Sequence, residues 1–421
     1  MISNPPIKNM KVSKKLSSTD SSKNIVEKLN KKTFLLQYLP SALEYLESDK
    51  YINYKSEKLK TAYLIDIIHN MVLKYYFKKE NKFVINATIL KDKYGYLYNY
   101  YINYLIEVKI IKMVSNYKKG VSSRKYSLNG NIIKSKIQRR YRNTDKVLLK
   151  KYKKKVMDSI DFSDNDDYLI GEGIREKLIS DLFSVDIQFD RAIFFLDALK
   201  DEKYDVYNRN VYSVECVNDK HIFYHFDNYG RMHTNFTILR SFIRKNCLLI
   251  DGEETCEIDI KNSQPLFLSK LIKDSGTKWV KEEEFELFRE LTLSGNYYQY
   301  MMNVLGIKNR NEAKELTYKV LFGRNITSSK ADIGFRKAFP TIHNFIKLYK
   351  KDNGNYKMMA YDLQKAESNL IFNRIIKRVI DLYPEIKMIT VHDSIVFPKK
   401  YKDIVNDIFE QEIENEFNLT K

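Results

Sequence analysis

The sequence predicts an α+β fold in which helices surround antiparallel strands that carry acidic residues. Residues 257–265 place Asp259 between two β-branched apolar residues, and residues 388–397 form an apolar run that contains Asp393. Such alternation is typical of strands. Between them, residues 310–323 carry a basic or aromatic side chain at every fourth position, namely Arg310, Lys314, Tyr318 and Phe322. This spacing indicates one face of a helix. Two strands that each present an Asp predict an acidic site held on a rigid sheet.

Length and composition bound the class of protein. The chain has 421 residues, 43% of them hydrophobic, so we expect a globular protein of two or three domains at about 150 residues each. No stretch approaches the roughly 20 apolar residues of a membrane helix, and no secretion signal follows the first Met. The cysteines Cys216, Cys247 and Cys256 lack C-x-x-C spacing. This argues against a disulfide framework or zinc site and favours the reducing cytoplasm.

The net charge of +19 predicts a polyanionic partner. A chain rich in Lys, Asn, Ile and Tyr from an AT-rich genome would also be basic. The charge therefore supports nucleic-acid binding only together with motifs that require it.

The N-terminal third divides into a tail and a compact unit. Residues 1–30 are rich in Lys and Ser and predict a disordered basic tail. Residues 31–136 form the compact unit, which contains an amphipathic helix over 59–76. Asn86 then marks the start of a helix, and a further helix follows the break at Gly95.

Two short strands complete this unit, at residues 110–114 and 124–128, joined by a glycine turn. Helix, helix and hairpin in this order are typical of a winged helix. In that fold Arg124 and Lys125 would lie on the wing and bind nucleic acid. Winged helices also serve as structural or protein-contact domains, and this alternative stays open.

Residues 137–210 are predicted to be a mainly helical connecting region. Basic residues crowd positions 139–142 and 150–155, an acidic loop covers 161–167, and residues 168–210 have helical patterning. Basic surfaces of this kind contact a nucleic-acid backbone without reading its sequence.

The remaining segment, 211–421, contains the acidic strands. A strand over 221–226 turns at 227–230 and is followed by Arg231. Asp259 and Asp393 could hold two Mg²⁺ ions roughly 3.5–4 Å apart. The alternative is structural: an amphipathic helix with its aromatic residues in the core, and a buried His–Asp pair.

Three motifs in order resemble those of a known family. They are D-x-x-N-S-Q at 259–264, R-x-x-x-K-x-x-x-Y-x-x-x-F-G at 310–323 and V-H-D-S at 391–394. They are similar to motifs A, B and C of family A DNA polymerases and of the related single-subunit phage and mitochondrial RNA polymerases. Residues 227–231 resemble the D-x-x-G-R element of the RNA polymerases, and residues 336–340 the segment after the fingers helix. The resemblance covers about residues 220–415.

The resemblance implies a right-hand polymerase: an antiparallel palm and helical fingers within 211–421, with the fingers around 280–350. It also implies a thumb-like region within 137–210. Two Mg²⁺ ions, or Mn²⁺, would be held by Asp259, Asp393 and the carbonyl of Ile260. Lys314 would be catalytic, protonating the leaving pyrophosphate. The other implied site residues are, for the nucleotide, Arg310, Lys314, Tyr318, Phe322 and Gln264, and, for the nucleic acid, Arg231, Gln364, His392 and Arg244.

The predicted function is therefore a small DNA-directed DNA polymerase. We expect a monomer that uses a DNA template, a primer and nucleoside triphosphates, aided by a replication-protein partner. No D-x-E exonuclease pattern is present, so we expect no proofreading. The small size of the chain suggests that a phage, plasmid or similar element encodes it, and hence that it acts in the cytoplasm of a bacterial host.

Several alternatives remain. Gln264 and Phe322 favour deoxynucleotides, whereas the D-x-x-G-R element and the His-Asp-Ser of motif C are of the RNA polymerase kind. A single-subunit RNA polymerase or primase-like enzyme is therefore the first alternative. A non-catalytic winged-helix replication or regulatory protein is the second, and a template-independent nucleotidyltransferase is the third.

Overall fold

The computed structural model describes most of the chain, namely residues 25, 27–78, 81–84, 86–118, 122–133, 138–158, 170–198, 200, 204–325 and 329–417. Most of the predicted tail, and the acidic loop at 161–167, lie outside these residues. The prediction of a disordered tail over residues 1–30 is wrong for its last residues. Residues 27–30 are helical, and Ile25 and Leu29 are fully or almost fully buried in the main core. Apolar residues four positions apart on one helical face explain this burial.

The main sheet is antiparallel, as predicted, in a mixed fold of helices and strands. Its strand order is β13-β14-β12-β11-β8. The strands are β8 (Val185–Ile187), β11 (Leu248–Ile250), β12 (Glu253–Asp259), β13 (Ile389–Val391) and β14 (Ser394–Pro398).

One predicted strand proves to be two. Residues 388–397 form β13 and β14, joined by a turn of only two residues, His392 and Asp393, with Val391 paired to Ser394. His392 adopts a left-handed backbone, with φ 58°. The turn contains no glycine, so the usual sequence signal of a two-residue hairpin turn is missing. Asp393 therefore lies at a hairpin tip and not in mid-strand.

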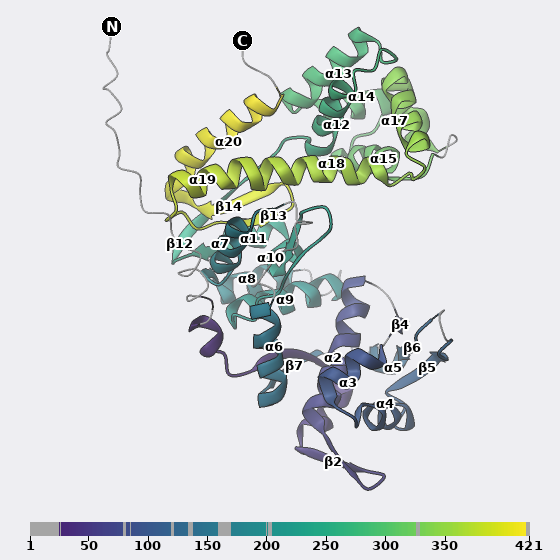
Figure 1. Ribbon diagram of the computed structural model, residues 1–421, viewed down its shortest axis with the longest axis vertical. Helices are drawn as coiled ribbons and strands as arrows, with labels where there is room; N and C mark the ends of the chain where they lie inside the picture. The colour runs from purple at the N-terminus through teal and green to yellow at the C-terminus, as the bar shows by residue number, and fades with distance from the viewer. Residues whose placement is uncertain are drawn as a thin grey trace.

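Helices form the region predicted as fingers, beside one end of the sheet (Figure 1). They are α12 (Ser263–Asp274), α13 (Glu282–Ser294), α14 (Tyr297–Leu305), α15 (Arg310–Phe322), α16 (Lys330–Ala338) and α17 (Pro340–Asp352). Gly323 ends α15.

A long continuous helix crosses between these helices and the sheet (Figure 1). It comprises α18 (Met358–Ser368), a π-helical stretch η2 (Asn369–Ile376) and α19 (Lys377–Leu382). The short helix η3 (Lys399–Tyr401) leads into α20 (Lys402–Phe417), which packs along η2. Arg374 and Arg378 of the long helix form ion pairs with Glu412 of α20 at 2.9 and 2.7 Å.

The N-terminal unit has its own hydrophobic core. Helix, helix and hairpin follow in the predicted order, with strand order β4-β6-β5. The Asn86 side chain caps α3 by accepting from the Thr88 backbone N–H at 2.8 Å, and Gly95 ends that helix with φ 79°. The elements are η1 (Ser41–Glu47), β2 (Tyr51–Tyr54), β3 (Glu57–Lys60), α2 (Thr61–Lys78), β4 (Phe83–Val84), α3 (Ala87–Tyr94), α4 (Tyr98–Glu107), β5 (Ile111–Ser115), β6 (Lys125–Leu128) and α5 (Gly130–Ile133).

The segment 137–210 is less helical than predicted. Strand β7 (Gln138–Asn143) pairs antiparallel with β1 (Leu35–Pro40), and β8 joins the main sheet. Both strands were missed because their partners lie far away in the sequence. The helices of this segment are α6 (Lys146–Asp158), α7 (Glu172–Leu182), α8 (Phe189–Asp197) and the first half of α9 (Tyr204–Asn218).

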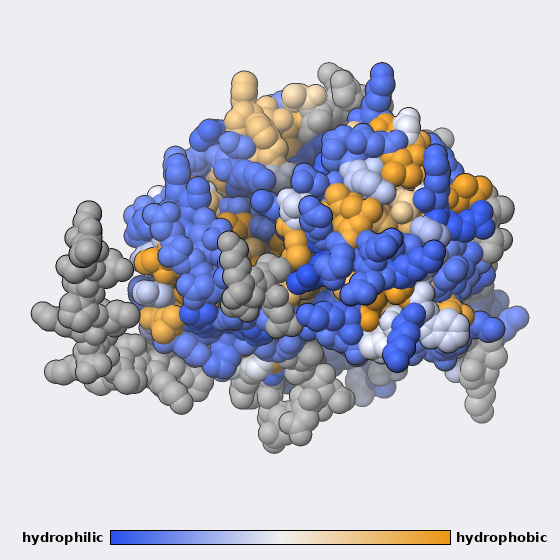
Figure 2. All heavy atoms as spheres, turned by 90° about the horizontal axis from the view of Figure 1, so that it is seen from above, coloured by the Kyte–Doolittle hydropathy of each residue, from blue (hydrophilic) through white to orange (hydrophobic). Residues whose placement is uncertain are grey.

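The entry to the main sheet is a small hairpin of β9 (Tyr224–Phe226) and β10 (Met232–Thr234), followed by α10 (Asn235–Ile238) and α11 (Ser241–Cys247). Hydrophilic residues cover most of the face that Figure 2 shows, with hydrophobic residues in small groups between them. Among the described residues, no helix has both the length and the apolar character needed to cross a bilayer.

Candidate functional site

The two predicted acidic residues lie at the same edge of the main sheet. Asp259 is the last residue of β12 and pairs with Ser394 of β14, and Asp393 immediately precedes Ser394. Burial and the negative charges of Glu367 and Asp259 raise the pKa of Asp393 to about 7, whereas Lys314 acts in the opposite direction. Carboxylates whose charges interact in this way disfavour each other's ionisation. A cation bound between them would relieve that repulsion.

Asp259 and Asp393 fit a divalent cation whose remaining ligands come from a bound substrate. Within the described ranges, no three or more His, Cys, Asp or Glu side chains gather as a metal cage would require. Mg²⁺ is commonly held by one or two carboxylates, with phosphates and water completing its shell. Both polar atoms of the Asn262 amide are buried without a hydrogen-bond partner among the described residues. Asn262 lies three residues after Asp259 in the sequence, in the turn between β12 and α12.

Helix α15 presents its predicted face to this edge. Asn309 caps the helix by accepting from the Asn311 backbone N–H at 2.9 Å. Lys314 Nζ lies 5.4 Å from the centre of the Tyr318 ring. Burial and the negative charges of Asp393 and Glu367 raise the pKa of Tyr318 to about 12. The Tyr318 hydroxyl therefore lies within the field of the acidic residues and not in an apolar core.

The neighbouring residues of α15 lie as the helical spacing requires. The rings of Tyr318 and Phe322 are 5.1 Å apart, and the guanidinium carbon of Arg310 lies 4.9 Å from the centre of the Tyr298 ring. Leu321 is fully buried, whereas Tyr318 and Phe322 are half-buried. The purely structural interpretation of this helix thus holds for Leu321 but leaves both aromatic rings partly accessible.

Glu367 of α18 is a site residue that the sequence analysis missed. It is 2% exposed. One carboxylate oxygen accepts from Arg231, at 3.1 Å from Nε and also from Nη2. The other accepts from the hydroxyl of Ser263 and from Gln264 Nε2, the latter at 2.5 Å. The available signal was Glu367 at helical spacing from Met359 and Leu363, which places an acidic residue on an apolar face, where a buried carboxylate requires partners.

Arg231 is held at the site by two interactions. Its backbone N–H donates to Asp227 Oδ1 at 2.9 Å, in the turn between β9 and β10, and its guanidinium binds Glu367. The predicted residue Gln364 is half-buried on α18, one helical turn before Glu367.

Arg244 shares an acceptor with Ser394, the residue after the β13–β14 turn, and His392 is part of that turn. Arg244 Nη2 donates to Glu257 Oε1 at 3.1 Å, and the hydroxyl of Ser394 donates to the same oxygen at 2.8 Å. The Arg244 side chain is only 11% exposed, so it braces the hairpin. His392 is exposed, and its ring centre lies 6.1 Å from that of His233.

Arg124 and Lys125 belong to the N-terminal unit, away from the main sheet (Figure 1). Arg124 is exposed and Lys125 is half-buried at the start of β6. A hollow of about 580 Å³ lies between α3, α4 and the hairpin and includes Arg124 in its lining. These two residues form a separate surface.

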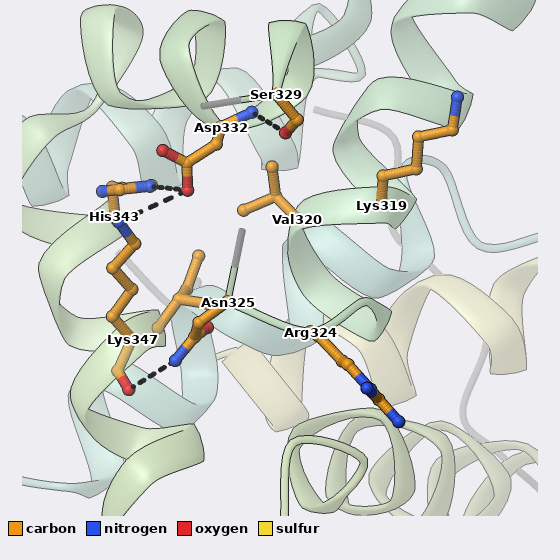
Figure 3. Close-up of a pocket in the computed structure, with 9 residues that line it drawn as sticks. Lys319, Val320, Arg324, Asn325, Ser329, Asp332, His343 and Lys347 are labelled. Carbon is orange, nitrogen blue, oxygen red and sulfur yellow. Dashed lines mark hydrogen bonds and ion pairs between the residues drawn. The ribbon is translucent and has the colours of Figure 1, made fainter. Parts of the chain in front are cut away.

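A smaller hollow of about 20 Å³ lies behind α15 (Figure 3). There His343 Nε2 is 2.8 Å and Lys347 Nζ is 3.4 Å from Asp332 Oδ1. Figure 3 shows that Lys319 and Arg324 point away from this pair. The hollow contains none of the predicted site residues, and its ion pairs join α16 to α17.

Comparison with protein-family models and with curated proteins gave no match for this chain. The chemistry of the site therefore has to follow from its own residues.

Proposed function

We propose that this chain is a template-directed nucleotidyltransferase, and specifically a small DNA polymerase of the family A type. One observation carries the proposal. Asp259, Asp393 and Lys314 come from three distant segments, yet the charges of Asp259 and Lys314 both act on the Asp393 carboxyl. These are the segments whose order resembles polymerase motifs A, B and C. If Asp259 and Asp393 had only a structural role, a lysine from the distant helix α15 would not be needed near them.

Nucleotidyl transfer requires an activated 3′-hydroxyl and a neutralised pyrophosphate leaving group. Asp259 and Asp393, with the Ile260 carbonyl, would hold two Mg²⁺ ions, which when bound acidify the hydroxyl and offset triphosphate charge. Lys314 and Arg310 would bind the triphosphate, and Lys314 would protonate the leaving pyrophosphate.

Other residues of the chain would position the substrates. The half-buried rings of Tyr318 and Phe322 offer surfaces for the sugar and base of the incoming nucleotide. In this proposal Arg231, His392 and Gln364 would contact the primer end. In this proposal Arg244 does not contact the nucleic acid. Its guanidinium supports the β13–β14 hairpin by donating to Glu257.

The polymerase architecture follows the same assignment. The main sheet would be the palm, α13 to α17 the fingers, and the basic α6 part of a thumb-like region. The N-terminal unit would be a winged-helix-like DNA-binding domain. Phosphate contacts by α6 and by Arg124 would add sequence-neutral affinity.

The test is primer extension with Mg²⁺ on a DNA template, supplying dNTPs and NTPs separately. The proposal expects dNTP incorporation that disappears in Asp393→Ala and persists in Asp407→Ala, whose exposed Asp lies on α20. Incorporation of NTPs alone would assign the chain to RNA or primer synthesis. Incorporation without template would indicate a terminal transferase, and no incorporation by folded protein would overturn the enzymatic proposal.

A further inference from the structure

The hollow of about 580 Å³ in the N-terminal unit takes no part in the acidic edge. It is surrounded by the first turn of α3, the first turns of α4 and the β5–β6 hairpin. Its volume lies within the range of roughly 300–1,000 Å³ that is typical of small-molecule sites. The hollow is therefore large enough for a ligand of the size of a nucleotide.

Tyrosine side chains from three places in the fold line the described part of this hollow. They are Tyr98 of α4, Tyr117 of the β5–β6 hairpin and Tyr126 of β6. Tyr117 is 58% exposed and Tyr98 is half-buried, so both rings have accessible surface. Every nucleobase can stack on such a ring, whatever its identity.

The Tyr126 hydroxyl indicates that the ligand is polar. Tyr126 is 4% exposed, and within the described part of the chain its hydroxyl has no hydrogen-bond partner. The hydroxyl is not among the fully enclosed polar atoms that lack a partner, so the oxygen retains access to the hollow that Tyr126 lines. A nearly buried hydroxyl without a partner gains from a ligand group that donates to it or accepts from it.

The charge of the hollow favours an anionic strand. Among the described residues that line it, Arg124 is the only charged one, and none is a carboxylate. Arg124 is exposed and has no ion-pair partner in the described ranges, so its guanidinium is free to bind a phosphate. Lys118 and Lys125 lie on the same hairpin. The exposed amide of Asn99 adds a donor and an acceptor for the edge of a base.

Helix α4 is poorly suited to a DNA duplex. It reads YNYYINYLIE and contains no Lys or Arg, the residues that neutralise phosphates and most often read guanine. Its first turns line the hollow with Tyr98 and Asn99. The bases of a duplex are stacked inside it and present only their edges in the grooves, whereas those of a single strand can stack on aromatic side chains. The hollow therefore favours an unpaired base.

We propose that the hollow of the N-terminal unit binds an unpaired nucleotide of single-stranded DNA. The base stacks on Tyr117 and Tyr98 and reaches the Tyr126 hydroxyl, and Arg124 binds the adjoining phosphate. The choice of DNA rests on the proposed polymerase function, whereas the binding of the base does not depend on nucleotidyl transfer.

The test measures binding of the full chain to labelled single-stranded and duplex DNA by fluorescence anisotropy, without nucleoside triphosphates. Tyr117→Ala removes an exposed ring, and we expect the affinity for the single strand to fall about tenfold, as for the loss of one stacked base. The affinity for the duplex should change by less than about twofold. Tyr96→Ala is the matched control, because Tyr96 is 83% exposed on the same unit but does not line the hollow, and it should change neither affinity.

Two further measurements locate the base. Tyr126→Phe removes only the hydroxyl and should weaken single-strand binding about threefold, as for one hydrogen bond. A single strand that carries 5-iodouracil forms a covalent cross-link on irradiation to an aromatic ring against which the base lies. Mass spectrometry should find this cross-link at Tyr98 or Tyr117 and not at Tyr96.

Any one of four results would overturn the inference. Equal effects of Tyr117→Ala and Tyr96→Ala, or cross-links only outside the hollow, would show that the hollow does not hold the base. Equal losses for single strand and duplex in Tyr117→Ala would assign the hollow to duplex binding. Tighter binding of an RNA strand of the same sequence, lost in Tyr117→Ala, would assign it to RNA. Primer extension tests the polymerase proposal separately, so its failure is distinguishable from each of these.

Discussion

Asp259 lies directly opposite Ser394 in the register of β12 and β14. Because the β13–β14 turn has only two residues, this register fixes Asp393 beside the end of β12. Ser394 and Arg244 both donate to Glu257 Oε1. These hydrogen bonds hold the residue after the turn against β12. The geometry of the acidic edge thus depends on strand pairing and on one ion pair, and not on a loop.

Replacing Asp393 should abolish activity without unfolding the chain. Asp393→Asn removes a carboxylate from the proposed metal site, and we expect incorporation to fall about a thousandfold or more. Single-nucleotide extension measures this, with Asp407→Asn on exposed α20 as control. More than a tenth of wild-type activity in Asp393→Asn would contradict the assignment.

The stability of the metal-free chain should fall as pH rises towards 7. The pKa of Asp393 is raised from its usual 3.8 to about 7 by burial and by Glu367. Between these values the folded chain holds a proton that the unfolded chain has released, so the free energy of unfolding decreases with increasing pH.

The measurement is thermal unfolding of the wild type and Asp393→Asn at pH 5 and pH 8 in chelator. The stability of the wild type relative to the variant should drop between these pH values by about 1 kcal/mol or more. Added Mg²⁺ should reduce the difference. A difference independent of pH would show that Asp393 is already ionised at pH 5.

Two lysines of α15 should differ in their effect on catalysis. The charge of Lys314 lowers the pKa of Asp393, whereas Lys319, five residues further along α15, lines the small hollow near Asp332 and His343. We expect Lys314→Met to lower incorporation by about 10²–10⁴, the range for a general acid. Lys319→Met, the matched control, should stay within about twofold of wild type. Equal effects would place the catalytic lysine elsewhere.

Gly323 should tolerate no side chain. A Cβ at this position would lie 2.4 Å from the backbone oxygen of Lys319, and Lys350 Nζ donates to the Gly323 carbonyl at 2.7 Å. Gly323→Ala should therefore destabilise the chain by about 1–3 kcal/mol. At Gly173 in α7 a Cβ meets nothing within 4 Å, so Gly173→Ala should stabilise by about 0.5–1 kcal/mol. Denaturant unfolding compares the two variants.

The N-terminal surface should contribute salt-dependent binding. The double replacement Arg124→Ala and Lys125→Ala should reduce the slope of log affinity against log salt by about 0.9 for each phosphate that the chain no longer neutralises. Fluorescence anisotropy with duplex DNA measures this, and Lys399→Ala with Lys402→Ala near α20 is the control. An unchanged slope would favour a structural or protein-contact role for this unit.

The sequence predicted the elements whose patterns are local. Asn86 and Gly95 bound α3 as expected, and α15 carries Lys314 and Tyr318 on one face. In each case the signal lies within a few residues of the element that it defines.

What the sequence did not predict depends on contacts between distant segments. Strand β7 pairs with β1, and the whole N-terminal unit separates the two strands in the sequence. The basic residues of β7 were therefore interpreted as part of a helical region. The β13–β14 turn uses a left-handed His392 in place of glycine. Glu367 is recognisable as a site residue only when its donors, Arg231 and Gln264, are brought to it by folding.

The pairing of β1 with β7 has a topological consequence. Leu35 is paired with Asn143, whereas Ile25 before this ribbon and Val156 after it both belong to the main core. The chain therefore passes from the main body into the N-terminal unit and returns beside the point of departure. The N-terminal unit is thus an insertion whose two ends are held together by paired strands, and Tyr212 and Cys216 of α9 join its core. Its position relative to the main body is therefore fixed by packing as well as by the chain connection.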